Sequence, residues 1–96
     1  MKAYCIVYER LHNPQMFEEY RKQVMPTLEA YGGKFLVRGG KFTAWEGEMP
    51  FERIAVLEFA SRKVAEDWYN SPAYQKILPL RTDATECQFI VVDGVD

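Results

Sequence analysis

The chain has 96 residues, with 12 lysines and arginines against 14 aspartates and glutamates, so its formal net charge is −2 and its isoelectric point is about 5.4. This balance excludes the basic patch that a nucleic-acid-binding protein usually carries, and no apolar run approaches the roughly 20 residues of a membrane span. A single domain over residues 1–96 is therefore expected, with neither a nucleic-acid nor a membrane partner.

The first part of the chain predicts a strand followed by a helix. Ala3–Glu9 is rich in β-branched and aromatic residues, which favours a strand. Asn13 suits a helix cap and Pro14 suits the first helical position. Apolar residues then recur at three- and four-residue steps, with Pro26 predicted to kink the helix and Gly32 to end it.

The middle of the chain predicts three extended pieces. Lys34–Arg38 lies between two Gly-Gly pairs and reads as a strand. Gly39 and Gly40 then turn the chain into a second short extended piece, Phe42–Glu46, and a loop follows. Arg53–Phe59 is the third extended piece and a clear strand.

The last part predicts two helical pieces and a strand. Ser61 caps the first piece. Ser71, followed by a proline, starts a second piece that runs to about Leu78, where Pro79 is predicted to stop it. The chain closes on a strand over Glu86–Val92.

The predicted order is β-α-β-β-α-β, which closes most naturally as an α+β, ferredoxin-like antiparallel sheet with both helical units on one face. Such a sheet usually alternates apolar and polar residues. Here the strands over Ala3–Glu9, Arg53–Phe59 and Glu86–Val92 are apolar on both faces. A second copy of the same sheet is the simplest cover for the helix-free face, so a homodimer through that face is expected.

Several motifs are then specific enough to compare with known families. They are Tyr20 with Val24 and Pro26, the segment 30–40, Glu46-Gly47, residues 57–59, residues 65–74 and Arg81. Together they resemble domain-of-unknown-function family 1330, of the dimeric α+β barrel superfamily, nearly end to end. The resemblance implies a ferredoxin-like protomer whose sheets pair into a dimeric barrel. The wider superfamily includes small monooxygenases, isomerases and haem-handling enzymes, but the family implies no settled activity, substrate or cofactor.

Two charged strand residues are the first candidates for a site. Arg38 ends a strand beside two glycines, so its direction is constrained. Its planar guanidinium suits either an anionic ligand or an ion pair with Glu46 or Glu58. Glu58 falls on an apolar strand face, where a carboxylate is either paired or a candidate acid or base.

A polar and aromatic cluster is the second source of candidates. Trp68 reads as core and Ser71 as a helix cap. Tyr69 and Tyr74 offer hydroxyls near the helix break and could line a pocket mouth. Arg81 either bonds the end of the last helical piece or a carboxylate across the dimer. If a pocket exists, we expect it between the sheet and these helical pieces, with Arg38 or Arg81 at its positive end.

The remaining reactive residues indicate no metal or cofactor. His12 is the only histidine and reads as a solvated loop residue. Cys5 and Cys87 lie in apolar strands and read as reduced, buried thiols of a cytoplasmic protein. The chain enters its first strand directly after Met1 and Lys2, so no signal peptide is expected. The nucleophile-elbow, phosphate-loop and dinucleotide motifs are absent from the sequence.

Two functional classes remain open from the sequence. The first is a cofactor-free enzyme, isomerase- or monooxygenase-like, acting on a small anionic or carbonyl-containing organic molecule. The second is a non-catalytic dimer that binds a small ligand or a protein. The catalytic candidates are Glu58, His12 and Tyr69. The ligand-binding candidates are Arg38, Glu46, Tyr69, Ser71, Tyr74 and Arg81.

Overall fold

A computed structural model describes residues 1–95; residue 96, the last of the expected domain, lies outside the described residues. The second helical unit is divided in two, as the Ser71-Pro72 pair predicted. The elements are β1 (Ala3–Leu11), α1 (Pro14–Glu29), β2 (Lys34–Arg38), β3 (Arg53–Phe59), α2 (Arg62–Tyr69), α3 (Pro72–Thr82) and β4 (Thr85–Asp93).

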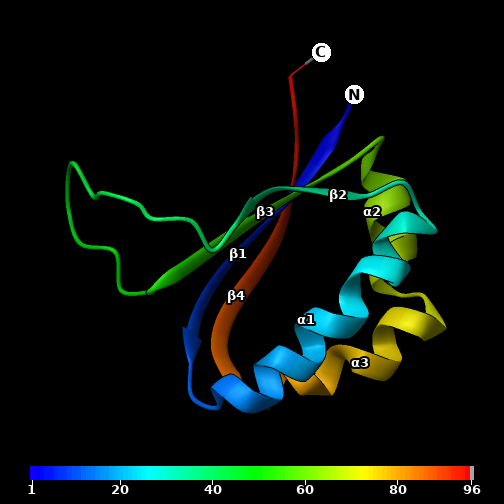
Figure 1. The fold of residues 1–96 in the computed structure, drawn as a ribbon. Coiled ribbons are helices and arrows are strands. Elements are labelled where there is room, and N and C mark those ends of the chain that lie inside the picture. The colour runs from blue at the N-terminus through cyan, green and yellow to red at the C-terminus, as the bar shows by residue number, and fades with distance from the viewer. Residues whose placement is uncertain (96) are drawn as a thin grey trace.

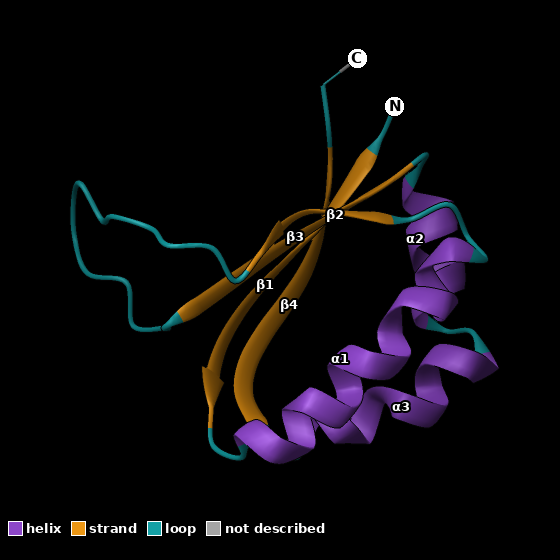
Figure 2. Ribbon diagram, viewed as in Figure 1, coloured by secondary structure: helices purple, strands orange, loops and turns teal. Residues whose placement is uncertain are grey.

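The strands form one antiparallel sheet in the order β2-β3-β1-β4. Figure 1 shows all three helices against one face of this sheet, and Figure 2 shows the other face without any helix. Cys5 of β1 lies opposite Leu57 of β3 and Val91 of β4, which sets the register at the centre of the sheet. The predicted α+β, ferredoxin-like fold is confirmed.

The helix starts follow the predicted caps. Asn13, Ser61 and Ser71 each accept, through the side chain, a hydrogen bond from the backbone N–H three residues further on. Pro14 and Pro72 occupy first helical positions, where the missing N–H costs nothing. Local sequence alone therefore sets where the three helices begin.

Two predicted features are wrong. Phe42–Glu46 forms no strand; the chain from 39 to 52 leaves the sheet as a long loop on the helix-free side (Figure 1). β3 is bonded on both edges, to β2 and β1, so the strand that follows this segment has no free edge for it to pair with. Pro79 does not end α3, which continues to Thr82 because the burial of Ile77 and Arg81 outweighs one lost hydrogen bond.

The core lies between the sheet and the helices. Trp68 and Tyr74 are fully buried there, with ring centroids 4.1 Å apart, as expected for Trp68. Both cysteines are free thiols. Cys5 is buried, and burial raises the pKa of its thiol to about 11, so it is neutral at physiological pH.

The helix-free face is apolar, as the strand pattern predicted. Ile6 of β1 lies opposite Val56 of β3 and Ile90 of β4, and all three point away from the helices. Ile90 is 49% exposed and Val92 is 42% exposed. Trp45, in the loop on the same side, is 92% exposed. Among the described helices, none has the length and apolar character needed to cross a membrane.

Candidate functional site

A hollow lies between the sheet and α1, and arginines dominate its polar lining. Apolar side chains of the strands form its floor, and α1 forms its roof. The free space is about 20 Å³, room for about one water molecule. The charged residues that line it are Glu9, Arg21, Arg38, Arg53 and Arg81; we call this hollow the arginine pocket.

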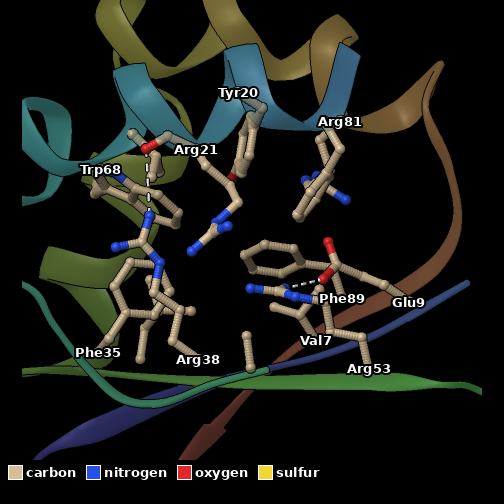
Figure 3. Close-up of a pocket in the computed structure, with 14 residues that line it drawn as sticks. Val7, Glu9, Tyr20, Arg21, Phe35, Arg38, Arg53, Trp68, Arg81 and Phe89 are labelled. Atoms are coloured by element: carbon tan, nitrogen blue, oxygen red, sulfur yellow. Dashed lines mark hydrogen bonds and ion pairs between the residues drawn. The ribbon is translucent and has the colours of Figure 1, made fainter. Parts of the chain in front are cut away.

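Four different elements supply the guanidinium groups. Arg21 comes from α1, Arg38 ends β2, Arg53 begins β3 and Arg81 lies in the last turn of α3. Figure 3 shows all four directed into the space between the sheet and α1. With Glu9 as the only lining carboxylate, the pocket carries a formal charge of +3.

Arg81 is the most deeply placed of these cations. Its side chain is 2% exposed, yet its hydrogen-bond partners include no carboxylate. Its Nε donates to the Tyr74 hydroxyl over 3.3 Å, and one terminal nitrogen lies 2.9 Å from the Cys87 sulfur. Burial lowers the pKa of Arg81, but the neighbouring Tyr74 and Tyr20 raise it by more, so the group stays charged. A buried cation without a carboxylate is unusual and favours an anionic ligand.

Aromatic rings support three of the four arginines. A guanidinium that stacks on a ring keeps its edge N–H groups free to bind an anion. These contacts also hold each side chain in one direction without neutralising its charge. The pairs are Arg38 over Phe35 at 4.4 Å, Arg53 over Phe17 at 4.9 Å and Arg81 over Phe89 at 4.8 Å.

Arg38 forms no ion pair with either carboxylate proposed for it. It donates instead to the backbone carbonyl of Arg21 over 3.2 Å. Burial, and then the positive charges of Arg21 and Arg53, lower the pKa of Arg38. Glu58 is paired, as expected, but with Lys2 at 3.5 Å and Lys34 at 3.4 Å. Like charges are therefore crowded around Arg38.

Glu9 is the one acidic group of the pocket. Its side chain is 2% exposed and bonds the guanidinium of Arg53, which faces it across β1 and β3. The pair balances one of the four positive charges.

Two tyrosine hydroxyls lie beside Arg81. The Tyr20 and Tyr74 hydroxyl oxygens are 2.8 Å apart, and Tyr74 also accepts from Arg81. Burial raises the pKa of both phenols, and the charges of Tyr74 and Glu9 raise that of Tyr20 further. Both hydroxyls are therefore protonated and able to donate a hydrogen bond at neutral pH.

Four of the predicted site residues are associated with this region. Arg38 and Arg81 line the arginine pocket, which lies against α1 and not at the helical pieces around Tyr69 and Tyr74 where a pocket was expected. Tyr74 does not line the pocket, but its hydroxyl is hydrogen-bonded to Arg81, which does. Ser71 caps α3 and donates a hydrogen bond to the Trp68 carbonyl.

The other candidates lie elsewhere. Glu58 is on the opposite face of the sheet, and Glu46 is exposed in the loop after β2. His12 is exposed in the turn between β1 and α1, 3.9 Å from Glu86. Tyr69 lines a second groove of about 280 Å³ between α2 and β4. The predicted set is thus divided among several places.

Sequence reasoning missed several pocket residues: Glu9, Arg21, Arg53 and the hydroxyl of Tyr20. A signal was available for two of them. Glu9 is in phase with Cys5 and Val7 on the helix-facing side of β1, and Arg53 is in phase with Leu57 on β3. A charged residue on the buried face of a strand is a site candidate by period-two counting alone.

Among residues 1–95, no three or more histidine, cysteine, aspartate or glutamate side chains gather in a way that could hold a metal ion. The candidate chemistry of the pocket therefore rests on guanidinium, carboxylate and phenol groups.

Comparison with known proteins identifies the family. The model described as Domain of unknown function (DUF1330) matches residues 2–95. The chain belongs to this family. No curated protein matches the chain in sequence.

Solved structures share its fold at low sequence identity. A protein of unknown function from Rhodopseudomonas palustris has a TM-score of 0.80 at 17% identity, covering 99% of this chain and 83% of that one. A dimeric ferredoxin-like protein of unknown function from Jannaschia sp. CCS1 has a TM-score of 0.75 at 11% identity, covering 98% and 100%. SnoaB, a cofactor-independent oxygenase from Streptomyces nogalater, has a TM-score of 0.64 at 8% identity, covering 99% and 94%.

Proposed function

We propose that this protein is a cytoplasmic homodimer that binds a small organic anion in the arginine pocket and acts on it without a cofactor. The observation that carries the proposal is Arg81, a charged group that is 2% exposed and hydrogen-bonded to no carboxylate among the described residues. An anion in the pocket would supply the missing negative charge. A carboxylate matches the planar fork of a guanidinium best.

The homodimer part rests on the helix-free face. Its apolar side chains, Ile90 and Val92 among them, are about half exposed in the single chain. A second copy of the same sheet would cover them. The dimeric ferredoxin-like protein from Jannaschia is compatible with this arrangement. The two thiols form no disulfide, which supports a location of the protein in a reducing compartment.

The choice between an enzyme and a binding protein depends on the pocket's own groups. The buried carboxylate of Glu9 and the phenols of Tyr20 and Tyr74 favour an enzyme, because they can exchange protons with a bound ligand. The free space of about 20 Å³ favours the alternative, a non-catalytic dimer that binds a small anion or the head of a larger one.

Thermal melting tests the anion site. We expect pyruvate or benzoate to raise the melting temperature, and the matching neutral amides to have no effect, since only the acids balance the pocket charge. Arg38→Lys keeps the charge and loses the fork, so acid binding should weaken about ten- to a hundredfold, in line with the loss of one charge-assisted hydrogen bond of about 1.5–3 kcal/mol. Arg38→Ala should weaken it further.

Arg62→Lys is the matched control, because Arg62 begins α2, does not line the pocket and pairs with Asp93 at the end of β4. It should leave acid binding unchanged. If both Arg38 variants lower the melting temperature and leave the affinity for the acid unchanged, Arg38 is structural and the assignment of the site is wrong.

A further inference from the structure

We infer that the arginine pocket is a proton-transfer site in which Glu9 is the base and the substrate is a small 2-oxo carboxylate, interconverted between its keto and enol forms. The inference rests on the proposed function, because the acid must first be held by the guanidinium groups. It adds the chemical class of the substrate and the identity of the base, which lies on β1, away from the sequence-predicted bases Glu58 and His12.

One oxygen of the Glu9 carboxylate is hydrogen-bonded, and the other has no hydrogen-bond partner among the described residues. Arg53 is the only side chain among the described residues that bonds it. Figure 3 shows the second oxygen turned away from Arg53, into the space below α1. Every fully buried side-chain nitrogen or oxygen in residues 1–95 has a hydrogen-bond partner, so this oxygen faces the pocket and is not sealed in protein.

Hydrogen-bond donors lie on the opposite side of the same space. Tyr20 projects from α1 into the pocket (Figure 3), and its hydroxyl is bonded to Tyr74, which is in turn bonded to Arg81. This series of hydrogen bonds ends at the positively charged guanidinium of Arg81. It is suited to a carbonyl oxygen that gains negative charge as a neighbouring C–H bond breaks.

These groups match the three parts of a 2-oxo acid. Arg38 holds the carboxylate, the Tyr20 hydroxyl bonds the 2-oxo oxygen, and Glu9 faces the C3 hydrogens. Glu9 accepts the C3 proton, the C–H electron pair forms the C2–C3 double bond, and the carbonyl pair moves to oxygen as an enolate. Returning a proton to C3 restores the keto acid, and protonation at oxygen releases the enol. No oxidant or reductant is needed.

The size of the pocket restricts the substrate to few carbons. The free space of about 20 Å³ does not hold a whole acid while Arg21 lies in it. The Arg21 side chain is 43% exposed and its one ion pair is with Glu18 on the same helix, so it can swing outward as the ligand enters. The fully buried Arg81 and Tyr74 cannot make room in this way. Three- or four-carbon acids are therefore favoured.

Deuterium exchange into pyruvate tests the inference directly. In D₂O, proton abstraction at C3 replaces the methyl hydrogens, and the methyl signal in the proton NMR spectrum disappears. We expect the wild-type dimer to speed this loss clearly above buffer. Glu9→Gln keeps the shape of the side chain and should reduce the enzyme-dependent rate by about 10²–10⁴-fold, the usual contribution of a general base. Tyr20→Phe should reduce it too, and Glu29→Gln, an exposed change at the end of α1, should not.

Pyruvate binding is measured in the same samples by saturation transfer from protein to ligand, and folding by circular dichroism. Binding without exchange in the wild type overturns the inference and leaves the proposed function standing. Absence of binding overturns both. An unchanged rate in folded Glu9→Gln also overturns the inference. If Glu9→Gln does not fold, the test rests on the exchange rates of the wild type and of Tyr20→Phe. An unchanged exchange rate in Tyr20→Phe rejects the proposed placement of the substrate.

Discussion

At the scale of single residues, the buried indole of Trp68 is held by a short series of hydrogen bonds. The indole N–H of Trp68 donates to the Thr27 hydroxyl over 3.0 Å, and that hydroxyl donates to the Val24 carbonyl over 2.6 Å. Trp68 is 0% exposed, so no water can replace Thr27 as its partner. The same tryptophan packs against Phe59 and Tyr74 at the back of the arginine pocket.

Thr27→Val should therefore destabilise the protein. Valine has nearly the same shape but leaves the Trp68 N–H unpaired, which costs about 1–3 kcal/mol in a buried site. Thr27→Ser keeps the hydroxyl and is the matched control, expected to cost less. Urea unfolding followed by circular dichroism measures both. Equal stabilities of the valine and wild-type proteins would show that this hydrogen bond contributes nothing.

At the scale of elements, the connection between α1 and β2 depends on a close approach of backbone and ring. A Cβ added at Gly33 would lie 2.5 Å from Phe59 Cε1 and 3.0 Å from Leu28 Cδ2. Gly33 therefore allows the end of α1 to pass over β3 and deliver β2, with Arg38 at its end, to the edge of the sheet. Gly32, with φ of +68°, makes the preceding turn.

Gly33→Ala should destabilise the fold by about 1–3 kcal/mol, because the buried Phe59 ring has no space to move into. Gly40→Ala is the control: its Cβ would meet nothing within 4 Å and it has no positive φ, so the change should stay within about 0.5 kcal/mol. Thermal melting compares the two. Similar effects of both substitutions would mean that the clash at Gly33 is relieved at little cost.

At the scale of the whole molecule, one sheet face is covered by helices and the other is bare. The bare face is continuous across β1, β3 and β4, and the loop 39–52 with the exposed Trp45 extends on its side (Figure 1). Val56 lies on this face, opposite Ile6. An uncovered apolar face of this kind is costly in water, which is why a second copy is the cover we propose.

Val56→Asp should convert a dimer into a monomer or prevent folding, because a carboxylate buried between two apolar sheets has no partner. Ala73→Asp places the same charge on the exposed outer surface of α3 and should leave the dimer intact. Light scattering at micromolar concentration gives the mass, with twice the chain mass of 11.2 kDa expected for the wild type. A stable wild-type monomer refutes the homodimer.

The sequence by itself determined the elements whose signals are local. The helix caps, the first-position prolines, the strands Lys34–Arg38 and Arg53–Phe59 and the apolarity of both sheet faces follow from neighbours in the chain, and the structure has all of them. Strand ends were short by one or two residues, since β1 runs to Leu11 and β4 begins at Thr85. Pro79 shows the limit, because tertiary burial of α3 overrode a local stop signal.

Only the tertiary structure decided the composition of the arginine pocket. Its cations come from α1, β2, β3 and α3, and nothing in their spacing shows that they meet. The antiparallel register brings Glu9 opposite Arg53. The packing of α3 against α1 links Arg81 to Tyr20 through the Tyr74 hydroxyl. Long-range pairing depends on which faces the whole chain can bury together. Arg38 and Arg81 could be named from the sequence, and period-two counting can place Glu9 on a buried strand face, but only the folded chain shows that these groups meet.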